Sequence, residues 1–474
     1  MSASQIDILL ICPNSKIPFV LPPLGLGYLA SHLLKNKITT DIKDCLLENI
    51  STDEVVDLIC KKNIKIIGIT CNTNEVPWVR ELVKKVKSQL DVTVIVGGPH
   101  PSGVLEKIYE DIEHIDFAIY SEGEYSLFLL TKAILENDLT EKRLESIPNL
   151  IWKDNYKIIK NLNKIPEDLD ELDFPAWHLI NPLKYSKKTP PGIFCKAFPF
   201  ASMITTRGCN YNCSFCASAV VHGRRLRSRS ADNVINEIAY LSRNYGIKEI
   251  FLEDDNFAFN KQYVKDFCKK IIDLNFKIFF SLPNGIRVDT IEPDILELMK
   301  KANFYSFALG IESGSQRILQ KMNKRTNLDM IRKRVSLAKK YGFYITGFFI
   351  IGYPDETLEE IDLTIKYAKS LKIDKLVVSK YTPFPGTESY NSLILNGEIS
   401  SWQPFEPFGT NDIPYSPKGI SKDELRAHIK KAIISWYLRP SVILRHVFKV
   451  KTFSQLRSLI KIIKNFLFAS NPLQ

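Results

Sequence analysis

Two successive blocks of alternating strand and helix patterns predict an α/β fold for this chain. In residues 1–140 apolar runs and amphipathic stretches alternate through five strands, which predicts a doubly wound parallel sheet with helices on both faces. In residues 197–390 the alternation runs through six cycles, which predicts an incomplete barrel. A length of 474 residues exceeds what one hydrophobic core usually supports, so several domains are expected.

The first block is expected to form a Rossmann-like domain whose ligand site lies beyond the carboxyl ends of its strands. A capping box of Ser51 and Glu54 opens one of its helices, which runs to Lys62. The strands are expected at Ile6–Ile11, Thr39–Ile42, Ile64–Thr70, Val92–Val96 and Phe117–Tyr120, and further helices at Leu24–Leu34, Pro77–Gln89 and Val104–Tyr109, with a last helix opened by Glu122-Gly123-Glu124.

Residues 141–196 interrupt this rhythm and are expected to form an ordered linker, because six prolines and several aromatic residues favour a fixed crossing. Residues 197–390 are expected to form a partial (β/α)6 TIM-like barrel with its chemistry on the loops after the strands. Residues 391–474 are expected to be mostly helical and basic. The barrel strands are expected at Ser202–Thr206, Glu249–Glu253, Ile278–Leu282, Tyr305–Gly310, Tyr344–Ile351 and Lys375–Tyr381, and its helices at Asp232–Tyr245, Lys261–Leu274, Pro293–Lys301, Leu328–Tyr341 and Leu358–Leu371.

Composition and termini exclude several protein classes. A hydrophobic content of 45% with 25% charged residues is typical of globular proteins and excludes a wholly disordered or collagen-like chain. Nine cysteines, an odd number in a long chain, argue against a secreted disulfide scaffold and for a reducing compartment. The N-terminus lacks the basic segment of a signal peptide, and no apolar run is long enough to span a bilayer. A cytoplasmic protein with thiols free for metal is therefore expected.

The strongest chemical signal is a C-x₃-C-x₂-C motif formed by Cys209, Cys213 and Cys216, directly after the first barrel strand. Three thiolates on one loop can hold three irons of a four-iron cluster and leave the fourth iron open for a substrate or cofactor. A zinc site is the alternative, with His222 six residues after Cys216, but zinc normally takes a fourth ligand closer by.

This motif resembles that of the radical S-adenosylmethionine superfamily, which has the same spacing and an aromatic residue before the third cysteine. The resemblance implies that Cys209, Cys213 and Cys216 ligate a [4Fe-4S] cluster and that Phe215 packs near the adenine of S-adenosylmethionine. It also implies that the unique iron binds the methionine amino and carboxylate groups. Reductive cleavage would then give a 5′-deoxyadenosyl radical that abstracts hydrogen from the substrate.

Segments after the other barrel strands also resemble parts of this cofactor site. The resemblance places carboxylates after the second strand against the methionine ammonium, a polar loop and a cation after the third strand at the same mouth, and later segments near the ribose, the carboxylate and the adenine. Read singly, each is a turn, a cap or a solvated acid, whereas five in register with five strands favour a site. The residues are Glu253, Asp254, Asn284, Arg287, Glu312, Ser313 and Gly352.

The first domain resembles the cobalamin-binding domain that precedes the barrel in cobalamin-dependent radical S-adenosylmethionine enzymes. Glycines at a strand end let the backbone approach a large flat ligand or its nucleotide tail. The D-x-H-x-x-G element that coordinates cobalt in many such domains is absent, so no histidine is expected beneath the cobalt. His100, read alone, is more typical of a structural histidine than of a metal ligand. The expected cobalamin contacts are Asp44, Thr70, Asn72, Gly97, Gly98, His100 and Glu122.

The C-terminal tail holds most of the net charge of +11. From Ser421 to Gln474 eleven basic residues face two acidic ones, so the rest of the chain is nearly neutral and is not expected to bind nucleic acid. The tail resembles the C-terminal segment of cobalamin-dependent radical enzymes of lipid and pigment pathways. A membrane-surface helix at Phe448–Phe468 and a helix packed on the barrel with a solvated basic face are equally consistent with its pattern.

The resemblance predicts a radical enzyme that methylates an unactivated carbon through a 5′-deoxyadenosyl radical and methylcobalamin. Its cofactors would be the [4Fe-4S] cluster, S-adenosylmethionine and cobalamin. Its partners would be a small-molecule or lipid substrate and an external low-potential electron donor. Two alternatives stay open: radical ring formation or oxidation without methyl transfer, and a regulator that binds cobalamin or the cluster without turnover. The sequence singles out no residue that reacts with the substrate, and it does not define the oligomeric state.

Overall fold

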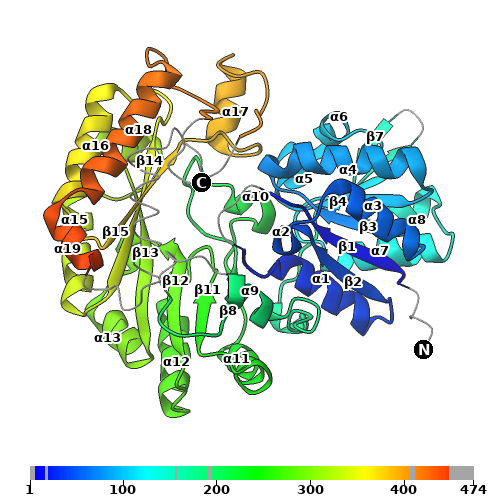
Figure 1. Ribbon diagram of the computed structural model, residues 1–474, viewed down its shortest axis with the longest axis horizontal. Coiled ribbons are helices and arrows are strands. Elements are labelled where there is room, and N and C mark those ends of the chain that lie inside the picture. The colour runs from blue at the N-terminus through cyan, green and yellow to red at the C-terminus, as the bar shows by residue number, and fades with distance from the viewer. Residues whose placement is uncertain (1–5, 16–19, 155–156, 189–194, 406–411, 448–474) are drawn as a thin grey trace.

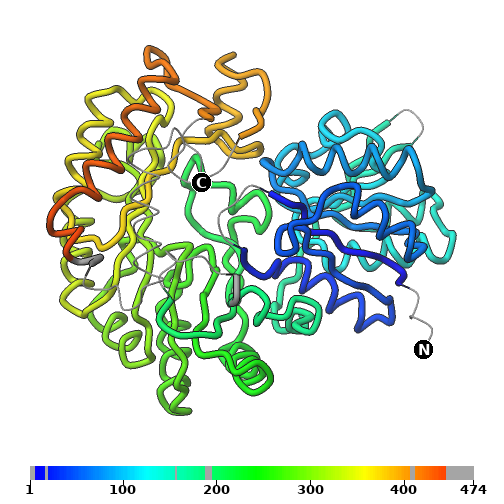
Figure 2. The backbone as a smooth tube through the Cα atoms, in the orientation of Figure 1, coloured from blue at the N-terminus to red at the C-terminus, as the bar shows by residue number. Residues whose placement is uncertain are grey.

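The computed structural model describes residues 6–15, 20–154, 157–188, 195–405 and 412–447 of the chain. Two lobes lie side by side, an N-terminal α/β lobe and a barrel lobe that carries the C-terminal helices on its outer side (Figure 1). Figure 2 shows the backbone crossing between them through the segment that follows the first sheet. The order of elements confirms the predicted α/β fold: a Rossmann-like domain, then a partial barrel.

The N-terminal lobe contains a seven-stranded sheet of order β2-β1-β3-β4-β5-β6-β7. Its first five strands are parallel. The chain adds β2 on one side of β1 and β3 to β5 on the other side, so the strand order reverses between β1 and β3. Such a point is where doubly wound sheets open a crevice for ligands at the carboxyl ends of the strands. The strands are β1 (Ile8–Cys12), β2 (Thr40–Asp44), β3 (Ile66–Thr70), β4 (Thr93–Gly97), β5 (Phe117–Ile119), β6 (Leu150–Asp154) and β7 (Lys157–Lys160).

Both faces of this sheet are buried, because side chains of successive residues point to opposite sides. Ile8 and Leu10 pack with α1, α7 and α8, whereas Leu9 and Ile11 pack with α3, α4 and α6. The apolar runs read as continuous in the sequence for this reason. The helices are α1 (Leu24–Lys35), α2 (Cys45–Glu48), α3 (Thr52–Lys61), α4 (Val76–Gln89), α5 (Pro99–Val104), α6 (Ile108–Asp111), α7 (Glu124–Leu135) and α8 (Glu141–Glu145).

The segment predicted as a linker contributes more to the fold than expected. Strands β6 and β7 form an antiparallel hairpin that extends the sheet beyond β5, so the sheet continues to Lys160. After the hairpin, Trp177 is buried in the barrel core and donates a hydrogen bond from Nε1 to Glu237 Oε1 at 2.9 Å. Helix α9 (Pro182–Lys188) follows and packs against the first barrel strand. The crossing is therefore ordered where the structure describes it.

The barrel lobe contains a six-stranded, entirely parallel sheet of order β15-β14-β13-β12-β11-β8. A continuous apolar core lies between its strands and its outer helices. A two-stranded ribbon of β9 and β10 lies at the mouth, after β8. The strands are β8 (Phe200–Met203), β9 (Thr206–Arg207), β10 (Arg227–Ser228), β11 (Glu249–Leu252), β12 (Phe279–Ile286), β13 (Phe304–Glu312), β14 (Tyr344–Ile351) and β15 (Lys375–Lys380).

Amphipathic helices cover the outside of this sheet, each between two strands, as predicted. The C-terminal helix α18 packs on β15 and α16, and its Trp436 is fully buried. The helices are α10 (Ser218–His222), α11 (Ala231–Tyr245), α12 (Lys261–Asp273), α13 (Pro293–Lys301), α14 (Gln316–Lys321), α15 (Leu328–Lys340), α16 (Leu358–Ser370), α17 (Glu388–Leu395), α18 (Lys422–Tyr437) and α19 (Pro440–Val447).

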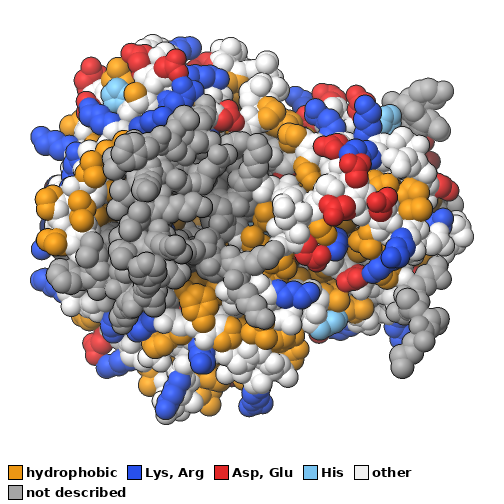
Figure 3. All heavy atoms as spheres, viewed as in Figure 1, with side chains coloured by type: hydrophobic (Ala, Val, Ile, Leu, Met, Phe, Trp, Pro, Cys, Tyr) orange, Lys and Arg blue, Asp and Glu red, His pale blue; other side chains and the backbone are white. Residues whose placement is uncertain are grey.

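The C-terminal prediction is tested only in part. The helix expected at Phe448–Phe468 lies outside the described residues. Within the described ranges, no helix is long and apolar enough to cross a bilayer. On the face shown in Figure 3, the described acidic and basic side chains are interspersed over both lobes, which agrees with a nearly neutral body.

Candidate cofactor site

The loop that carries the three cysteines begins at the ribbon strand β9 and ends at α10. Gly208 opens it with a positive φ of 87°, and a Cβ there would lie 2.4 Å from the Arg225 carbonyl oxygen, so only glycine fits. Ser214 anchors its middle: its N–H donates to the Met322 carbonyl at 3.1 Å, and its Oγ lies 2.7 Å from the Tyr353 hydroxyl. The cysteines therefore lie on a short loop held at both sides of the mouth.

The thiols suit a cluster better than a single metal ion. Cys209 and Cys213 are half-buried and Cys216 is exposed, and burial raises the pKa of the Cys209 thiol above its usual value. Burial disfavours the bare thiolate, and a bound cation such as iron supplies the positive charge that lets the thiol lose its proton. Among the described residues, no three Cys, His, Asp or Glu side chains converge closely enough for one ion. A [4Fe-4S] cluster needs no such convergence, because each cysteine binds a different iron.

Two cations lie beside the cysteines. Arg287, which follows β12, directs Nη1 at Cys213 Sγ from 3.6 Å, and its guanidinium lies 3.7 Å from the centre of the Tyr211 ring. Lys324 is buried after α14, donates to Glu312 Oε1 at 2.6 Å, and lies 5.8 Å from the centre of the Phe215 ring. Positive charge at this position stabilises thiolates and the net negative charge of a thiolate-bound cluster.

Lys324 was not predicted from the sequence. It lies twelve residues after Glu312, on the far side of α14, and only the packing of that helix brings its ammonium to the mouth. The carboxylate of Glu312 is therefore already paired, and its backbone takes a positive φ of 67°. A basic residue after a short helix carries no local signal for such a pair.

The end of β11 presents two polar side chains with few or no partners in the protein. Glu253 accepts one hydrogen bond from Ser202 Oγ at 3.2 Å, and burial raises the pKa of its carboxyl to about 7. No cation pairs with Glu253 among the described residues, where only Ser202 and the neighbouring Asp254 act on its carboxyl. Asn256, three residues on, is 1% exposed and neither its side-chain oxygen nor its nitrogen has a hydrogen-bond partner there. Such groups are expected where a polar ligand completes the site, so these residues fit the ammonium of S-adenosylmethionine.

Other predicted residues at this mouth hold the protein together. Asp254 accepts hydrogen bonds from the backbone N–H and the hydroxyl of both Thr205 and Thr206, which fixes the chain that leads into the cysteine loop. Ser313 Oγ is bonded to Thr364 and to the Ser315 N–H. These two side chains are therefore engaged within the protein.

Asn284 lies within the end of β12 rather than on a loop after it, and Gly352 directly follows β14, at the same mouth. Asn284 donates to the Glu253 carbonyl at 2.8 Å and so links the ends of β11 and β12. Gly352 has a φ of 85° and donates its N–H to Glu356 Oε2 at 2.6 Å. The structure thus brings the predicted residues after β11, β12, β13 and β14 to one edge of the sheet.

The carboxyl ends of the first sheet present small residues rather than charges. Thr70 ends β3 beside the switch point, Gly97 ends β4, and Gly98 follows it. Gly98 has a φ of 104°, and a Cβ there would meet Thr70 Oγ1 at 2.9 Å, so the two strand ends approach more closely than any other residue allows. An open edge of this kind fits a large flat ligand held by shape and by the backbone, as cobalamin is.

Three charged or polar residues expected at that edge are engaged elsewhere. Asp44 caps α2 through the Leu47 N–H and accepts from the Tyr185 hydroxyl, both at 2.8 Å. His100 is fully buried, with its two ring nitrogens bonded to Thr73 and Asp111. Asn72 is exposed and donates to Glu75. His100 thus has the surroundings of a structural histidine.

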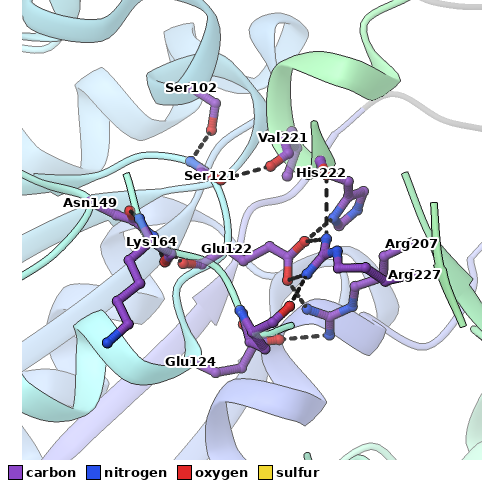
Figure 4. Close-up of polar contacts among 11 residues, drawn as sticks. Ser102, Ser121, Glu122, Glu124, Asn149, Lys164, Arg207, Val221, His222 and Arg227 are labelled. Carbon is purple, nitrogen blue, oxygen red and sulfur yellow. Dashed lines mark hydrogen bonds and ion pairs between the residues drawn. The ribbon is translucent and has the colours of Figure 1, made fainter. Parts of the chain in front are cut away.

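Glu122 has a different set of partners from those expected. Its carboxylate points out of the first domain and is bound by Arg207, Arg227 and His222, all from the barrel lobe (Figure 4). Both carboxylate oxygens are engaged by these side chains, whereas a cobalamin contact was predicted. No local pattern indicates these partners, because they lie about a hundred residues away along the chain.

Comparisons with known proteins agree with this geometry. The model described as Radical SAM superfamily matches residues 203–368, and that described as B12 binding domain matches residues 12–130. An uncharacterized methyltransferase, PH0819 of Pyrococcus horikoshii, is 33% identical over 433 residues, which are 90% of each chain. The anaerobic magnesium-protoporphyrin IX monomethyl ester cyclase of Cereibacter sphaeroides is 25% identical and covers 88% of this chain and 68% of its own. The cobalamin-dependent S-adenosylmethionine radical enzyme OxsB shares the fold, with a TM-score of 0.74, 16% identity, and coverage of 97% of this chain and 71% of OxsB.

Proposed function

Because the chain belongs to the cobalamin-dependent radical S-adenosylmethionine enzymes, we propose that it methylates an unactivated carbon of a small-molecule or lipid substrate. Its relative from Pyrococcus horikoshii, matched along nine-tenths of both chains, is described as a methyltransferase, which supports this class of reaction. The cluster, S-adenosylmethionine and cobalamin are the cofactors of the family.

The observation that carries the proposal is the meeting of the two carboxyl-terminal sheet edges. Gly103, on the helix after β4, lies so close to the loop after β15 that a Cβ would be 2.5 Å from the Pro385 carbonyl oxygen. A Cβ on Gly386 of that loop would in turn be 3.2 Å from Val220, on α10 after the cysteines. The loops that follow β4, β15 and the cysteine motif therefore converge, which supports one shared reaction space for both cofactors.

When bound, the cluster supplies the electron that cleaves S-adenosylmethionine, and cobalamin carries the methyl group. The chain's own residues bind and orient these groups. We assign cluster ligation to Cys209, Cys213 and Cys216, and the methionine ammonium to Glu253, whose carboxyl has no described cation. Arg287 and Lys324 supply positive charge next to the cysteines.

Ring formation is the second candidate, because the relative from Cereibacter sphaeroides is described as a cyclase. The two reactions differ in what happens to S-adenosylmethionine. A methyltransferase releases S-adenosylhomocysteine as well as 5′-deoxyadenosine, whereas a cyclase without methyl transfer releases 5′-deoxyadenosine alone.

The test uses the reconstituted full chain under anaerobic conditions with hydroxocobalamin, titanium(III) citrate and trideuteromethyl-labelled S-adenosylmethionine. Lipid and peptide extracts are added, and products are screened by mass spectrometry. A compound that gains one trideuteromethyl group in place of hydrogen supports the proposal. Turnover that changes a substrate without the label, and without S-adenosylhomocysteine, supports ring formation or oxidation instead.

We place the reaction in the cytoplasm, with electrons from an external low-potential donor, since an iron–sulfur cluster and free thiols suit a reducing compartment. Peripheral contact with an anionic membrane is part of the proposal. Leu438, Ile443 and Leu444 are exposed near the start of the basic tail, and apolar side chains beside basic residues suit a membrane surface. Sedimentation with anionic vesicles at low salt tests this: the full chain should pellet, and a truncation before Phe448 should not. Equal behaviour of both chains would contradict it.

A further inference from the structure

A buried ion cluster joins the two domains at the cysteine loop. Glu122, between β5 and α7, has a side chain that is 1% exposed. Its Oε2 accepts from Arg207 Nη1 at 2.8 Å and Arg227 Nη1 at 3.2 Å, and its Oε1 binds Arg227 Nη2 and lies 3.0 Å from His222 Nδ1. Figure 4 shows the carboxylate between the two guanidinium groups and the His222 ring. One residue of the first domain thus holds three of the second.

These three partners of Glu122 lie at the two ends of the segment that carries the cysteines. Arg207 ends β9, two residues before Cys209. His222 ends α10, six residues after Cys216. Arg227 lies on β10, directly opposite Arg207 in the antiparallel ribbon. A single carboxylate therefore closes residues 207–227 into a loop and holds both of its ends.

The backbone that carries Glu122 is itself tied to the crevice of the first sheet. Ser102 Oγ donates to the Gly98 carbonyl and accepts from the Ser121 N–H, both at 2.8 Å. Ser121 Oγ then donates to the Val221 carbonyl on α10, also at 2.8 Å. The Glu122 carbonyl accepts from Asn149 at 2.8 Å. Hydrogen bonds therefore run from the glycine pair after β4 to the helix after Cys216.

The charge of Glu122 is matched in the folded protein. Burial alone would raise the pKa of its carboxyl, but the hydrogen bonds from His222 and Arg227 and the charge of Arg207 outweigh it and hold the pKa well below its usual value. Arg207 also donates to Glu124 Oε1 at 2.7 Å, so a second carboxylate supports the same guanidinium. Removing one member of such a buried cluster leaves charges without partners, which makes the site sensitive to substitution.

We propose that Glu122 is a positioning residue that fixes the cysteine loop against the cobalamin-binding domain and thereby sets the placement of the cluster relative to cobalamin. The proposal rests on the proposed function, because it requires both cofactors in one reaction space. The proposal goes beyond the proposed function because it assigns the relative placement of the two cofactors to an ion cluster. This ion cluster touches neither the cysteine sulfurs nor the crevice directly.

The test compares Glu122→Gln with Glu237→Gln in the full chain. Glu237 is an equally buried partner of an arginine, Arg229, at 2.5 Å, but it lies on α11, away from the cysteine loop. The first readout is hydrogen–deuterium exchange in the protein without cofactors. Glu122→Gln should speed exchange of residues 208–226 on the order of tenfold, and Glu237→Gln should leave these residues near the wild-type rate even where it lowers the melting temperature equally.

The second readout is the magnetic coupling between the reduced cluster and cob(II)alamin in the reconstituted protein. Wild type should show one narrow distribution of couplings, Glu122→Gln a broadened one, and Glu122→Asp an intermediate one. Where Glu122→Gln does not fold, His222→Ala removes one contact and should give the same pattern at smaller amplitude. Wild-type exchange of residues 208–226 in Glu122→Gln, or equal acceleration by Glu237→Gln, would overturn the proposal. If the chain binds no cobalamin but Glu122→Gln and Glu237→Gln give the expected exchange rates, the proposed function is contradicted and the role of Glu122 in fixing the cysteine loop is supported.

Discussion

The two carboxyl-terminal sheet edges are built on different principles. At the barrel edge, Asn256 is buried without a described partner and Glu253 has a hydrogen bond from Ser202 but no described cation, beside Arg287 and Lys324. At the edge of the first sheet, Asp44, His100 and Glu122 are all satisfied by the protein. We therefore predict that the barrel edge binds a small charged ligand and that the first domain offers glycine, threonine and backbone to a large one.

The comparison teaches that a charged residue at a strand end is not by itself a ligand contact. What separates the two edges is whether the side chain has already found a partner elsewhere in the fold. In the first domain, that partner comes from the linker for Asp44 and from the barrel lobe for Glu122. Asp44 and Glu122 therefore tie this edge to later parts of the chain, and we predict that the small residues bind the ligand.

The largest expected effect is on the barrel side. Cys213→Ala should remove one cluster ligand and lower cleavage of S-adenosylmethionine to 5′-deoxyadenosine by at least about a hundredfold. Iron content and product are measured after anaerobic reconstitution. Cys60→Ala, at an exposed cysteine of α3, is the matched control and should behave as wild type. An active variant lacking all three motif cysteines would contradict the assignment of the site.

The second prediction is that Glu253, at the barrel edge, binds the ammonium of S-adenosylmethionine. Burial raises the pKa of Glu253 to about 7, and an ammonium nearby favours the ionised form. Affinity for S-adenosylmethionine should therefore increase as pH rises through this value, because more of the carboxyl is then charged before binding. Glu253→Gln should lower affinity on the order of tenfold and abolish the pH dependence.

Isothermal titration of the cluster-loaded protein with S-adenosylmethionine measures this. Asp266→Asn, on the exposed face of α12, is the control and should retain both affinity and pH dependence. A Glu253→Gln variant that keeps the pH dependence would place the ammonium elsewhere.

The third prediction concerns the small residues of the first edge. Gly98→Ala adds a methyl group 2.9 Å from Thr70 Oγ1 at a φ of 104°, so it should push the ends of β3 and β4 apart and lower cobalamin affinity about tenfold. Gly246→Ala is the control, since its φ of 63° is also positive but nothing lies within 4 Å of the added Cβ. It should cost about 1 kcal/mol of stability and leave cobalamin binding unchanged. Equal cobalamin affinity of both variants would contradict the assignment of cobalamin binding to the crevice at the ends of β3 and β4.

The smallest expected effect is on the pH dependence of stability, to which two buried carboxyls, Glu356 and Glu122, contribute with opposite signs. Burial raises the pKa of Glu356, after β14, to about 8, whereas the pKa of Glu122 is lowered by its cations. A carboxyl whose pKa is raised in the folded protein binds more protons in the folded than in the unfolded chain. The contribution of Glu356 to stability therefore falls as pH rises from its ordinary pKa of 4.5 towards 8. The contribution of Glu122 has the opposite sign and is lost only at acid pH.

Melting temperature against pH measures this difference. Glu356→Gln should remove a slope of at most about 1.4 kcal/mol per pH unit between about pH 6 and 8. Glu359→Gln, at an exposed position in the next helix turn, should leave the slope unchanged. A wild-type slope in Glu356→Gln would show that this carboxyl stays ionised in the fold.

The fold could be predicted from the sequence largely because its signals are local. Strand β14 was predicted at its observed bounds, and β8, β11 and β15 within a few residues, since each is a short apolar run between helical patterns. The β6–β7 hairpin was missed because Pro148 and the short run after it read as linker. Only its pairing with β5 makes it part of the sheet.

In the candidate site, too, the locally encoded features could be predicted and the features that depend on long-range packing could not. The cysteine motif is contiguous, so its place on the loop after the first barrel strands followed from the sequence. Lys324, Arg207 and the partners of Glu122 did not, because each depends on elements that are distant along the chain and meet only in the packed structure. A strand-end carboxylate looks the same in the sequence whether its partner is a ligand or an arginine of another domain.

The most direct measurement needs no knowledge of the substrate. The reconstituted full chain is incubated anaerobically with titanium(III) citrate and labelled S-adenosylmethionine, with and without hydroxocobalamin, and both nucleoside products are quantified by mass spectrometry. We expect 5′-deoxyadenosine under both conditions and S-adenosylhomocysteine only when cobalamin is bound, with the label on the cobalamin. Bound and reduced cobalamin that gains no label, with no S-adenosylhomocysteine formed, would contradict a methyltransferase.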